Sequence, residues 1–113
     1  MSEILLCRVV LSAELPAAEV EFLASSIQLT SAKVQKTTSR AFGADDLALL
    51  ITILVGIGQL TEYGISIAKA INSWRRQARQ KGLEPQGKLE RPDHPPLDLN
   101  TATDEEVEEW LLH

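Results

Sequence analysis

Residues 44–81 constrain the fold of this chain more than any other segment. The segment begins with Asp45 and Asp46, whose carboxylates favour the start of a helix, and no proline interrupts it. One continuous helix over these residues would be about 57 Å long. A compact domain of 113 residues has a diameter of roughly 34 Å. A helix over 44–81 therefore breaks, at 56–58 or at Gly64, or its apolar face is covered by a membrane or by other copies of the protein.

The predicted helix 44–81 is amphipathic, with an unusually wide apolar face. Between Leu47 and Gly58 the one polar residue is Thr52. We expect the apolar face to mediate self-association or membrane docking. The residues expected to do so are Leu50, Ile53, Leu54, Ile57, Gly64, Ala68 and Trp74.

The polar residues of the same helix suggest an alternative function. They recur at helical spacing and form one narrow stripe. If several copies assembled in a bilayer, the stripe would line the lumen of a pore, through Gln59, Glu62, Ser66 and Lys69. The alternative is therefore a small membrane effector whose oligomerised helices form a pore.

The first forty residues predict a small β-α-β unit. Residues 3–12 form a nearly continuous aliphatic run, which favours a strand covered on both faces. Pro16 suits the first turn of a helix, and apolar residues then recur at helical spacing up to Ile27. Residues 32–40 are β-branched and polar, which predicts an edge strand whose lysines discourage pairing with other edges.

Charge is distributed unevenly along the chain. Residues 1–81 contain nine basic and seven acidic residues, whereas residues 82–113 contain two basic and nine acidic residues. A basic collar of Arg75, Arg76, Arg79 and Lys81 ends the long helix, and an acidic tail follows it. Either both regions are simply solvated, or the tail docks on the collar or on a basic partner.

The tail divides into a linker and a terminal helix. Residues 82–102 hold four of the five prolines, which predicts an extended, proline-rich linker. Residues 103–113 begin with a capping box and predict a short amphipathic helix, which needs a groove of its own chain or of a partner. The residues expected to bind a partner are Val107, Trp110 and Leu111, with Asp104, Glu105 and Glu106 steering the helix to a basic groove.

The residue types that carry catalysis or metal binding are sparse. His94 and His113, the two histidines, lie in the predicted linker and at the terminus, and Cys7 lies in an apolar strand. No nucleophile and base can be assembled from them on a rigid element, so we expect a non-enzyme without cofactor or metal. The net charge of −5 argues against nucleic-acid binding. A start without a secretory signal predicts an intracellular protein, in the cytoplasm or at the cytoplasmic face of the inner membrane.

Three segments resemble the effector-associated constant component family of bacterial conflict systems. They are Ile4–Leu11, the apolar segment Gly43–Ile71, and the run from Ala70 to Arg76 that contains Trp74 followed by two arginines. The resemblance implies a small non-catalytic subunit that assembles or regulates variable effectors such as peptidases or nucleases. The chain departs from the pattern after Lys81, where an acidic, proline-rich tail stands in place of a further strand.

These observations lead to one expected organisation and to three functional hypotheses. We expect an α+β protein with a β-α-β body and long helix over 1–81, a linker over 82–102 and a terminal helix over 103–113. The leading hypothesis is an adaptor of a bacterial antiviral defence or signalling system that binds a protein partner and forms homo-oligomers. The alternatives are the membrane pore and an antitoxin-like inhibitor that acts through the acidic tail.

Overall fold

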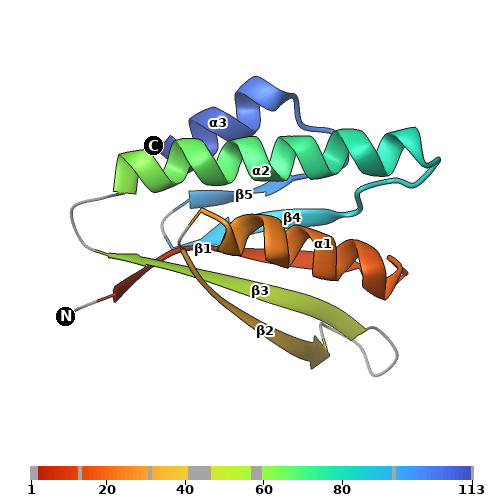
Figure 1. The fold of residues 1–113 in the computed structure, drawn as a ribbon, viewed down its shortest axis with the longest axis horizontal. Helices are drawn as coiled ribbons and strands as arrows, with labels where there is room; N and C mark the ends of the chain where they lie inside the picture. The colour runs from red at the N-terminus through yellow and green to blue at the C-terminus, as the bar shows by residue number, and fades with distance from the viewer. Residues whose placement is uncertain are drawn as a thin grey trace.

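The protein has an α+β fold, as the sequence predicts. The computed structural model describes residues 3–12, 14–30, 32–40, 47–56, 60–92 and 94–112. Its elements are β1 (Glu3–Ser12), α1 (Ala17–Gln28), β2 (Lys33–Arg40), β3 (Leu47–Gly56), α2 (Leu60–Gln80), β4 (Gly87–Arg91), β5 (His94–Asp98) and α3 (Asp104–Leu112). Figure 1 shows α1 and α2 lying across the sheet, with α3 beside α2.

The five strands form one antiparallel sheet in the order β2-β3-β1-β4-β5. Because β3 lies antiparallel between β1 and β2, these two strands are parallel to each other and separated by one strand. The same relation holds for β3 and β4, which flank β1. The first six elements are thus two interlocked split β-α-β units, which is the ferredoxin-like connectivity. The second helix connection places α2 over the middle of the sheet.

The elements predicted in the first forty residues are present, but their arrangement differs from the predicted unit. The predicted strands and helix correspond to β1, α1 and β2, and β2 is an edge strand of the sheet. Lys36 of this strand pairs with Glu21 of α1 at 2.6 Å, so one of its lysines also ties the edge to a helix. The unit differs from a simple β-α-β unit only because β3 is inserted between its two strands.

The single helix predicted over 44–81 is wrong. Residues 47–56 form β3, which pairs with β1 on one side and with β2 on the other, and the helix begins only at Leu60. A short apolar run can form either a central strand or a buried helix, and its length and composition are what distinguish the two. The β-branched residues Ile51, Ile53 and Val55 favour a strand here. The strand ends at Gly56, at one of the two places, 56–58, where a break of the helix was predicted. The remaining helix, about 32 Å long, fits within the 38 Å longest extent of the molecule.

The linker predicted over 82–102 is also wrong. Residues 87–91 form β4, which pairs with β1, and residues 94–98 form β5, which pairs with β4. Pro95 and Pro96 lie in β5 at the edge of the sheet, the position in which a strand tolerates residues without an N–H donor. A strand, β4, therefore follows α2 where the sequence predicted an extended, proline-rich linker.

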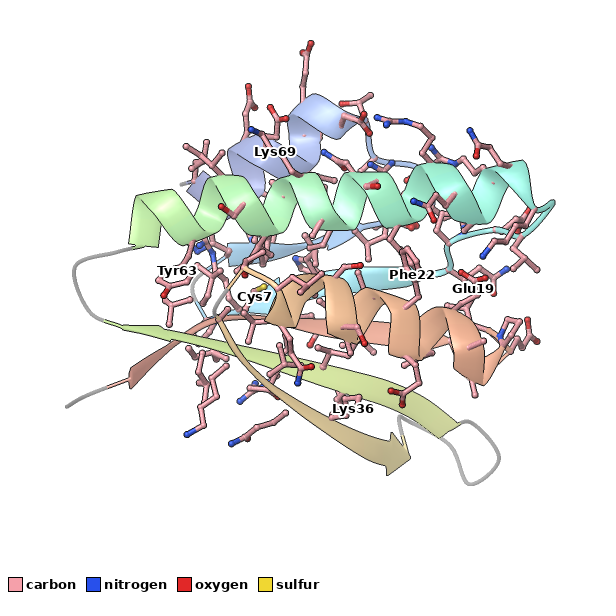
Figure 2. The ribbon with its side chains drawn as sticks, in the orientation of Figure 1. Cys7, Glu19, Phe22, Lys36, Tyr63 and Lys69 are labelled. Carbon is pink, nitrogen blue, oxygen red and sulfur yellow. The ribbon has the colours of Figure 1, made fainter. Side chains whose placement is uncertain are left out.

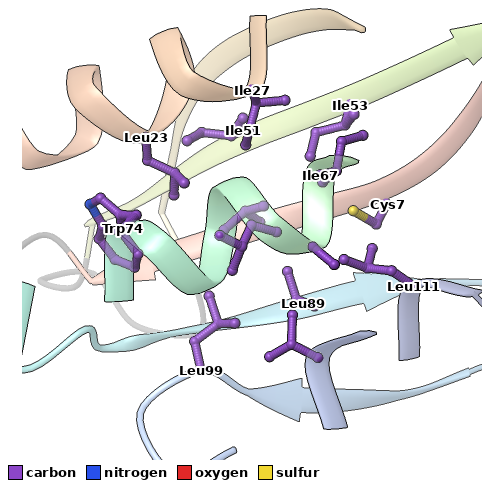
Figure 3. Packing of buried hydrophobic residues seen from close by; sticks show 14 of the residues in the cluster. Cys7, Leu23, Ile27, Ile51, Ile53, Ile67, Trp74, Leu89, Leu99 and Leu111 are labelled. Atoms are coloured by element: carbon purple, nitrogen blue, oxygen red, sulfur yellow. The ribbon is translucent and has the colours of Figure 1, made fainter. Parts of the chain in front are cut away.

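One hydrophobic cluster joins the sheet to all three helices (Figure 3). Trp74 and Ile71 of α2 belong to this cluster and are fully buried. Leu23 of α1 packs on one side, while Leu89 of β4 and Leu111 of α3 pack on the other. The C-terminal residues share this core, so the chain is not divided into a body, a linker and a separate helix.

Candidate interaction site on helices α2 and α3

Four polar residues of α2 hold the segment that leads into α3. They are Asn72, Arg75, Arg76 and Arg79, which we call the arginine clamp. Their spacing of three, one and three residues places them on one face of the helix. Each of them donates a hydrogen bond to residues 99–104 or, in the case of Arg75, also to another clamp residue.

Arg75 is the centre of the clamp, with a side chain only 1% exposed. Its Nε donates to the carbonyl oxygen of Leu99 at 2.9 Å, and its Nη2 donates to that of Ala102. Its Nη1 donates to Asn72 Oδ1 at 2.8 Å and to Asp104 Oδ1 at 3.1 Å. A guanidinium supplies five donors in a fixed fork, so one side chain satisfies carbonyl groups that water cannot reach.

The rest of the clamp binds the outside of the same segment. Arg79 donates to the carbonyl oxygen of Asn100 at 2.9 Å, and Asn72 donates to that of Asp104 at 3.2 Å. Exposed Arg76 reaches Asp104 at 3.4 Å. The acidic tail therefore docks on the basic collar, which was one of the two interpretations of the charge pattern.

The surroundings of Arg75 shift the pKa of its guanidinium both down and up. Burial lowers its pKa most, and the positive charge of Arg79 lowers it further. Asp104 and Glu106 raise the pKa, which favours the charged form. The acidic start of α3 thus stabilises a cation that burial alone would disfavour.

The predicted capping box at the start of α3 is present. The Thr103 N–H donates to Glu106 Oε1 at 3.0 Å, and the Glu106 N–H donates to Thr103 Oγ1 at 3.1 Å. These two bonds satisfy N–H groups that the helix leaves unpaired. The N-terminal carboxylates also favour this end of the helix dipole.

The apolar residues of α3 that were predicted to bind a partner, Val107, Trp110 and Leu111, contact the protein's own chain instead. Val107 is fully buried and Leu111 is 2% exposed, because both pack in the protein's own core. Trp110 is partly buried and its Nε1 donates to the carbonyl oxygen of Pro95 at 2.8 Å. The groove that this helix needs is thus formed by α2 and the β4–β5 hairpin.

Arg91 of β4 completes the attachment of Trp110. Its guanidinium lies 4.7 Å from the centre of the indole ring, and its Nη2 donates to the Trp110 carbonyl oxygen at 2.7 Å. The imidazole of His94 meets the same indole edge-on, with 6.0 Å between ring centres. Trp110 therefore fixes the end of α3 to the hairpin within one chain.

The outward side of α3 remains available to other molecules. Glu105, Glu108, Glu109 and Leu112 are all exposed, and their helical spacing places them on one stripe, which we call the outward stripe. Leu112 is 40% exposed, and its side chain lies next to Gly64 of α2. Ile65, which follows that glycine, is 42% exposed. The row of carboxylates thus ends in the exposed Leu112, and Ile65 is exposed one residue after the glycine that Leu112 contacts.

The residues predicted for self-association or membrane docking lie mostly inside the protein. Ile53, Gly64, Ala68 and Trp74 are buried, and the small Gly64 admits the Leu111 backbone at 3.1 Å from the position that a Cβ would take. The close helix approach predicted at Gly64 therefore occurs between α2 and α3 of the same chain. Leu50 and Leu54 are half-buried on β3, and Ile57 lies outside the described residues. Within the described part of the chain, no helix has both the length and the apolar character required to span a bilayer.

Three of the predicted lumen residues, Glu62, Ser66 and Lys69, lie on α2. Ser66 and Lys69 are exposed on α2, where Figure 2 labels Lys69. Gln59 and the side chain of Glu62 lie outside the described part of the chain. The described part of the stripe is the solvated side of α2, because the opposite side of that helix covers the sheet.

Two features of this site are not predicted from the sequence. Arg75 was predicted as one residue of the exposed basic collar, and Asn72 was given no role, although their spacing with Arg76 and Arg79 places all four on one helix face. Leu112 and Ile65 were not considered, because the exposure of a single aliphatic residue depends on which helix lies beside it. No pattern within α3 alone identifies α2 as that neighbour.

Cys7 is a buried structural thiol on β1, directed towards the helices (Figure 2). Burial raises the pKa of the Cys7 thiol to about 12, while the nearby Arg91 guanidinium lowers it by a smaller amount. A thiol that keeps its proton is a poor nucleophile and a poor metal ligand. The geometry therefore supports a packing role for this side chain.

The raised pKa of Cys7 predicts a loss of stability in alkali. Above about pH 9 the unfolded chain loses the thiol proton and the folded chain keeps it, so the free energy of unfolding falls by about 1.4 kcal/mol per pH unit for this group. Urea unfolding of the protein and of Cys7→Ala, from about pH 8 to about pH 10.5, separates this group from the others. We expect the stability difference between the two to narrow as the pH rises. A constant difference would contradict the raised pKa.

Comparisons of this chain with protein-family models, with curated proteins and with solved structures give no match.

Proposed function

We propose that the protein is a non-catalytic adaptor that binds a basic segment of a protein partner through the outward stripe of α3. The observation that carries the proposal is the stripe itself, three exposed carboxylates on a helix whose other sides are fixed to the protein. A rigid surface loses little conformational entropy on binding, and its charge steers oppositely charged partners towards it. The exposed aliphatic pair Leu112 and Ile65 would supply the apolar contact at the end of the stripe.

The proposed biological setting comes from the sequence resemblance. A small non-catalytic subunit encoded beside variable effectors is what the effector-associated constant component resemblance implies. Such a subunit needs one surface that its effectors recognise, and the outward stripe is a candidate for it. The membrane pore is not proposed further, because Leu47–Gly56 is a strand of the sheet and does not continue α2.

An antitoxin-like inhibitor is the second candidate, and the same stripe favours it. In that case the carboxylates of Glu105, Glu108 and Glu109 would cover a basic site on the partner and block its activity. The adaptor and the inhibitor differ in what happens to the partner after binding. Activity of the purified partner, assayed with and without this protein, distinguishes them.

The proposal predicts a partner whose binding depends on the outward stripe. The tagged full-length protein is expressed in its own cells, and co-purifying proteins are quantified for the original chain and for the double variant Glu108→Gln with Glu109→Gln. We expect at least one partner to fall about tenfold with this variant. The same partner should be released as the salt concentration rises, because exposed charge pairs are screened.

A matched variant controls for the change in net charge. Glu14→Gln with Glu84→Gln removes two exposed carboxylates elsewhere and should leave the partner bound. Leu112→Ser tests the apolar end of the stripe and should also weaken capture. If all variants retain the same proteins in equal amounts, the outward stripe is not the binding surface.

A further inference from the structure

The face of the sheet opposite the helices has an unusual composition, and we call it the outer face. Strand residues alternate between faces, and buried Val9 of β1 and Ile51 and Ile53 of β3 face the helices. Residues next to them in sequence therefore point the other way. The outer face includes Arg8 and Val10 of β1, Leu50, Thr52 and Leu54 of β3, Gln35 of β2 and Glu90 of β4.

Four aliphatic residues form the middle of the outer face. Leu5 pairs with Leu54, and Val10 pairs with Leu50, across the two central strands β1 and β3. Directly paired residues lie on the same side of a sheet, so Leu5 shares the outer face and Leu6 is the extra residue at the irregularity between Leu5 and Cys7. All four are half-buried. Antiparallel sheets with one solvated face normally carry polar residues there, whereas aliphatic residues on both faces are typical of strands covered on both sides.

The charges around these aliphatic residues indicate which class of molecule can cover the outer face. Arg8, Lys33 and Lys88 carry positive charge, and Glu90 and Asp98 carry negative charge, so the two signs are nearly balanced. A nucleic-acid surface needs an excess of positive charge and, for single strands, aromatic rings on which bases stack. The described side chains of the outer face offer neither. A balanced rim around an aliphatic centre fits a protein surface with the same properties.

The aliphatic pairs are arranged so that the outer face is complementary to itself. A twofold axis parallel to the strands and between β1 and β3 would place Leu54 of one copy over Leu5 of the other. It would likewise place Leu50 over Val10, and Thr52 over Arg8. Two sheets stacked in this way lie about 10 Å apart with their strands nearly aligned.

The size of the outer face predicts how strongly it can associate. Five strands at about 4.8 Å, each taken as about seven residues long at about 3.4 Å per residue, give a surface of roughly 24 Å by 24 Å. Two such surfaces bury about 1,100–1,200 Å², which is at the lower limit of specific interfaces and is typical of weak, reversible association. We propose that a second copy of this chain covers the outer face, so that the protein forms a reversible sheet-to-sheet homodimer.

Sedimentation of the full-length protein from about 1 µM to about 500 µM tests this proposal. The double variant Leu50→Gln with Leu54→Gln removes two aliphatic contacts from each copy and should weaken dimerisation at least about tenfold. Leu29→Gln, at a residue that is 87% exposed at the end of α1, removes one aliphatic side chain elsewhere and should leave the dimer unchanged. Thermal unfolding at low concentration shows whether each variant is folded.

If the double variant Leu50→Gln with Leu54→Gln does not fold, a second variant tests whether the outer face forms the dimer. Thr52→Arg keeps all four aliphatic residues and places its new charge opposite Arg8 of the other copy, so it should weaken the dimer. Adding Arg8→Glu should restore association. A protein that stays monomeric at every concentration overturns the proposal, and so does a dimer that is unaffected by these outer-face variants.

Discussion

Replacement of Arg75 by alanine is expected to lower the free energy of unfolding by about 3–5 kcal/mol. The side chain is buried and donates to the carbonyl oxygens of Leu99 and Ala102, which lose their donors in the variant. Each unsatisfied buried group costs about 1–3 kcal/mol. Urea unfolding followed by circular dichroism measures the loss.

Arg76→Ala is the matched control, because Arg76 is the next residue and binds the same carboxylate of Asp104. Its side chain is 65% exposed, so we expect a change of no more than about 1 kcal/mol. A small loss for Arg75→Ala, similar to that of the control, would show that the clamp contributes little to the fold.

The second large effect is expected for Trp74→Ala, with a loss of about 3–5 kcal/mol in the free energy of unfolding. Trp74 is completely buried, so its removal leaves a cavity in the core. Its Nε1 also donates to the Glu19 carbonyl oxygen at 3.1 Å, which ties α2 to α1. In the Trp74→Ala variant, Trp110 is the one remaining tryptophan, and its fluorescence shows whether α3 stays packed against the β4–β5 hairpin.

Trp74→Phe separates the two contributions of this side chain. Phenylalanine keeps most of the apolar contact but cannot donate to Glu19, so we expect a smaller loss of about 1–3 kcal/mol. Equal losses in both variants would mean that the hydrogen bond, and not the packing, accounts for the effect.

The sequence predicts the elements whose signals are local. The strand at 3–12, the helix after Pro16 and the polar edge strand after it are recognisable from periodicity and from where the charges lie. The capping box before α3 is equally local, since it needs only Thr103 and Glu106. These predictions are correct because each depends on residues within one or two turns of each other.

Two predictions failed because the deciding contacts are distant in sequence. Residues 47–56 become a strand because β1 and β2 pair with them on both sides, which no pattern within the run reveals. The prolines at 95 and 96 indicated a linker, but they are tolerated because β5 lies at the edge of the sheet.

The interaction site also depends on contacts between residues that are distant in sequence. Arg75 belongs to a run of basic residues that looks solvated, and only the arrival of residues 99–104 makes it a buried donor. Conversely, Val107 and Leu111 looked available to a partner and are enclosed by their own chain. What remains exposed on α3 is the side that faces away from α2.

Amide hydrogen exchange of α3 tests the central claim most directly, namely that the arginine clamp makes this helix part of the fold and fixes the outward stripe. In the unmodified protein, the amides of residues 107–111 should be protected nearly as well as those in the middle of α2. In Arg75→Ala this protection should fall first in α3. Exchange of α3 in the unmodified protein at the rate of an unstructured chain would contradict the claim.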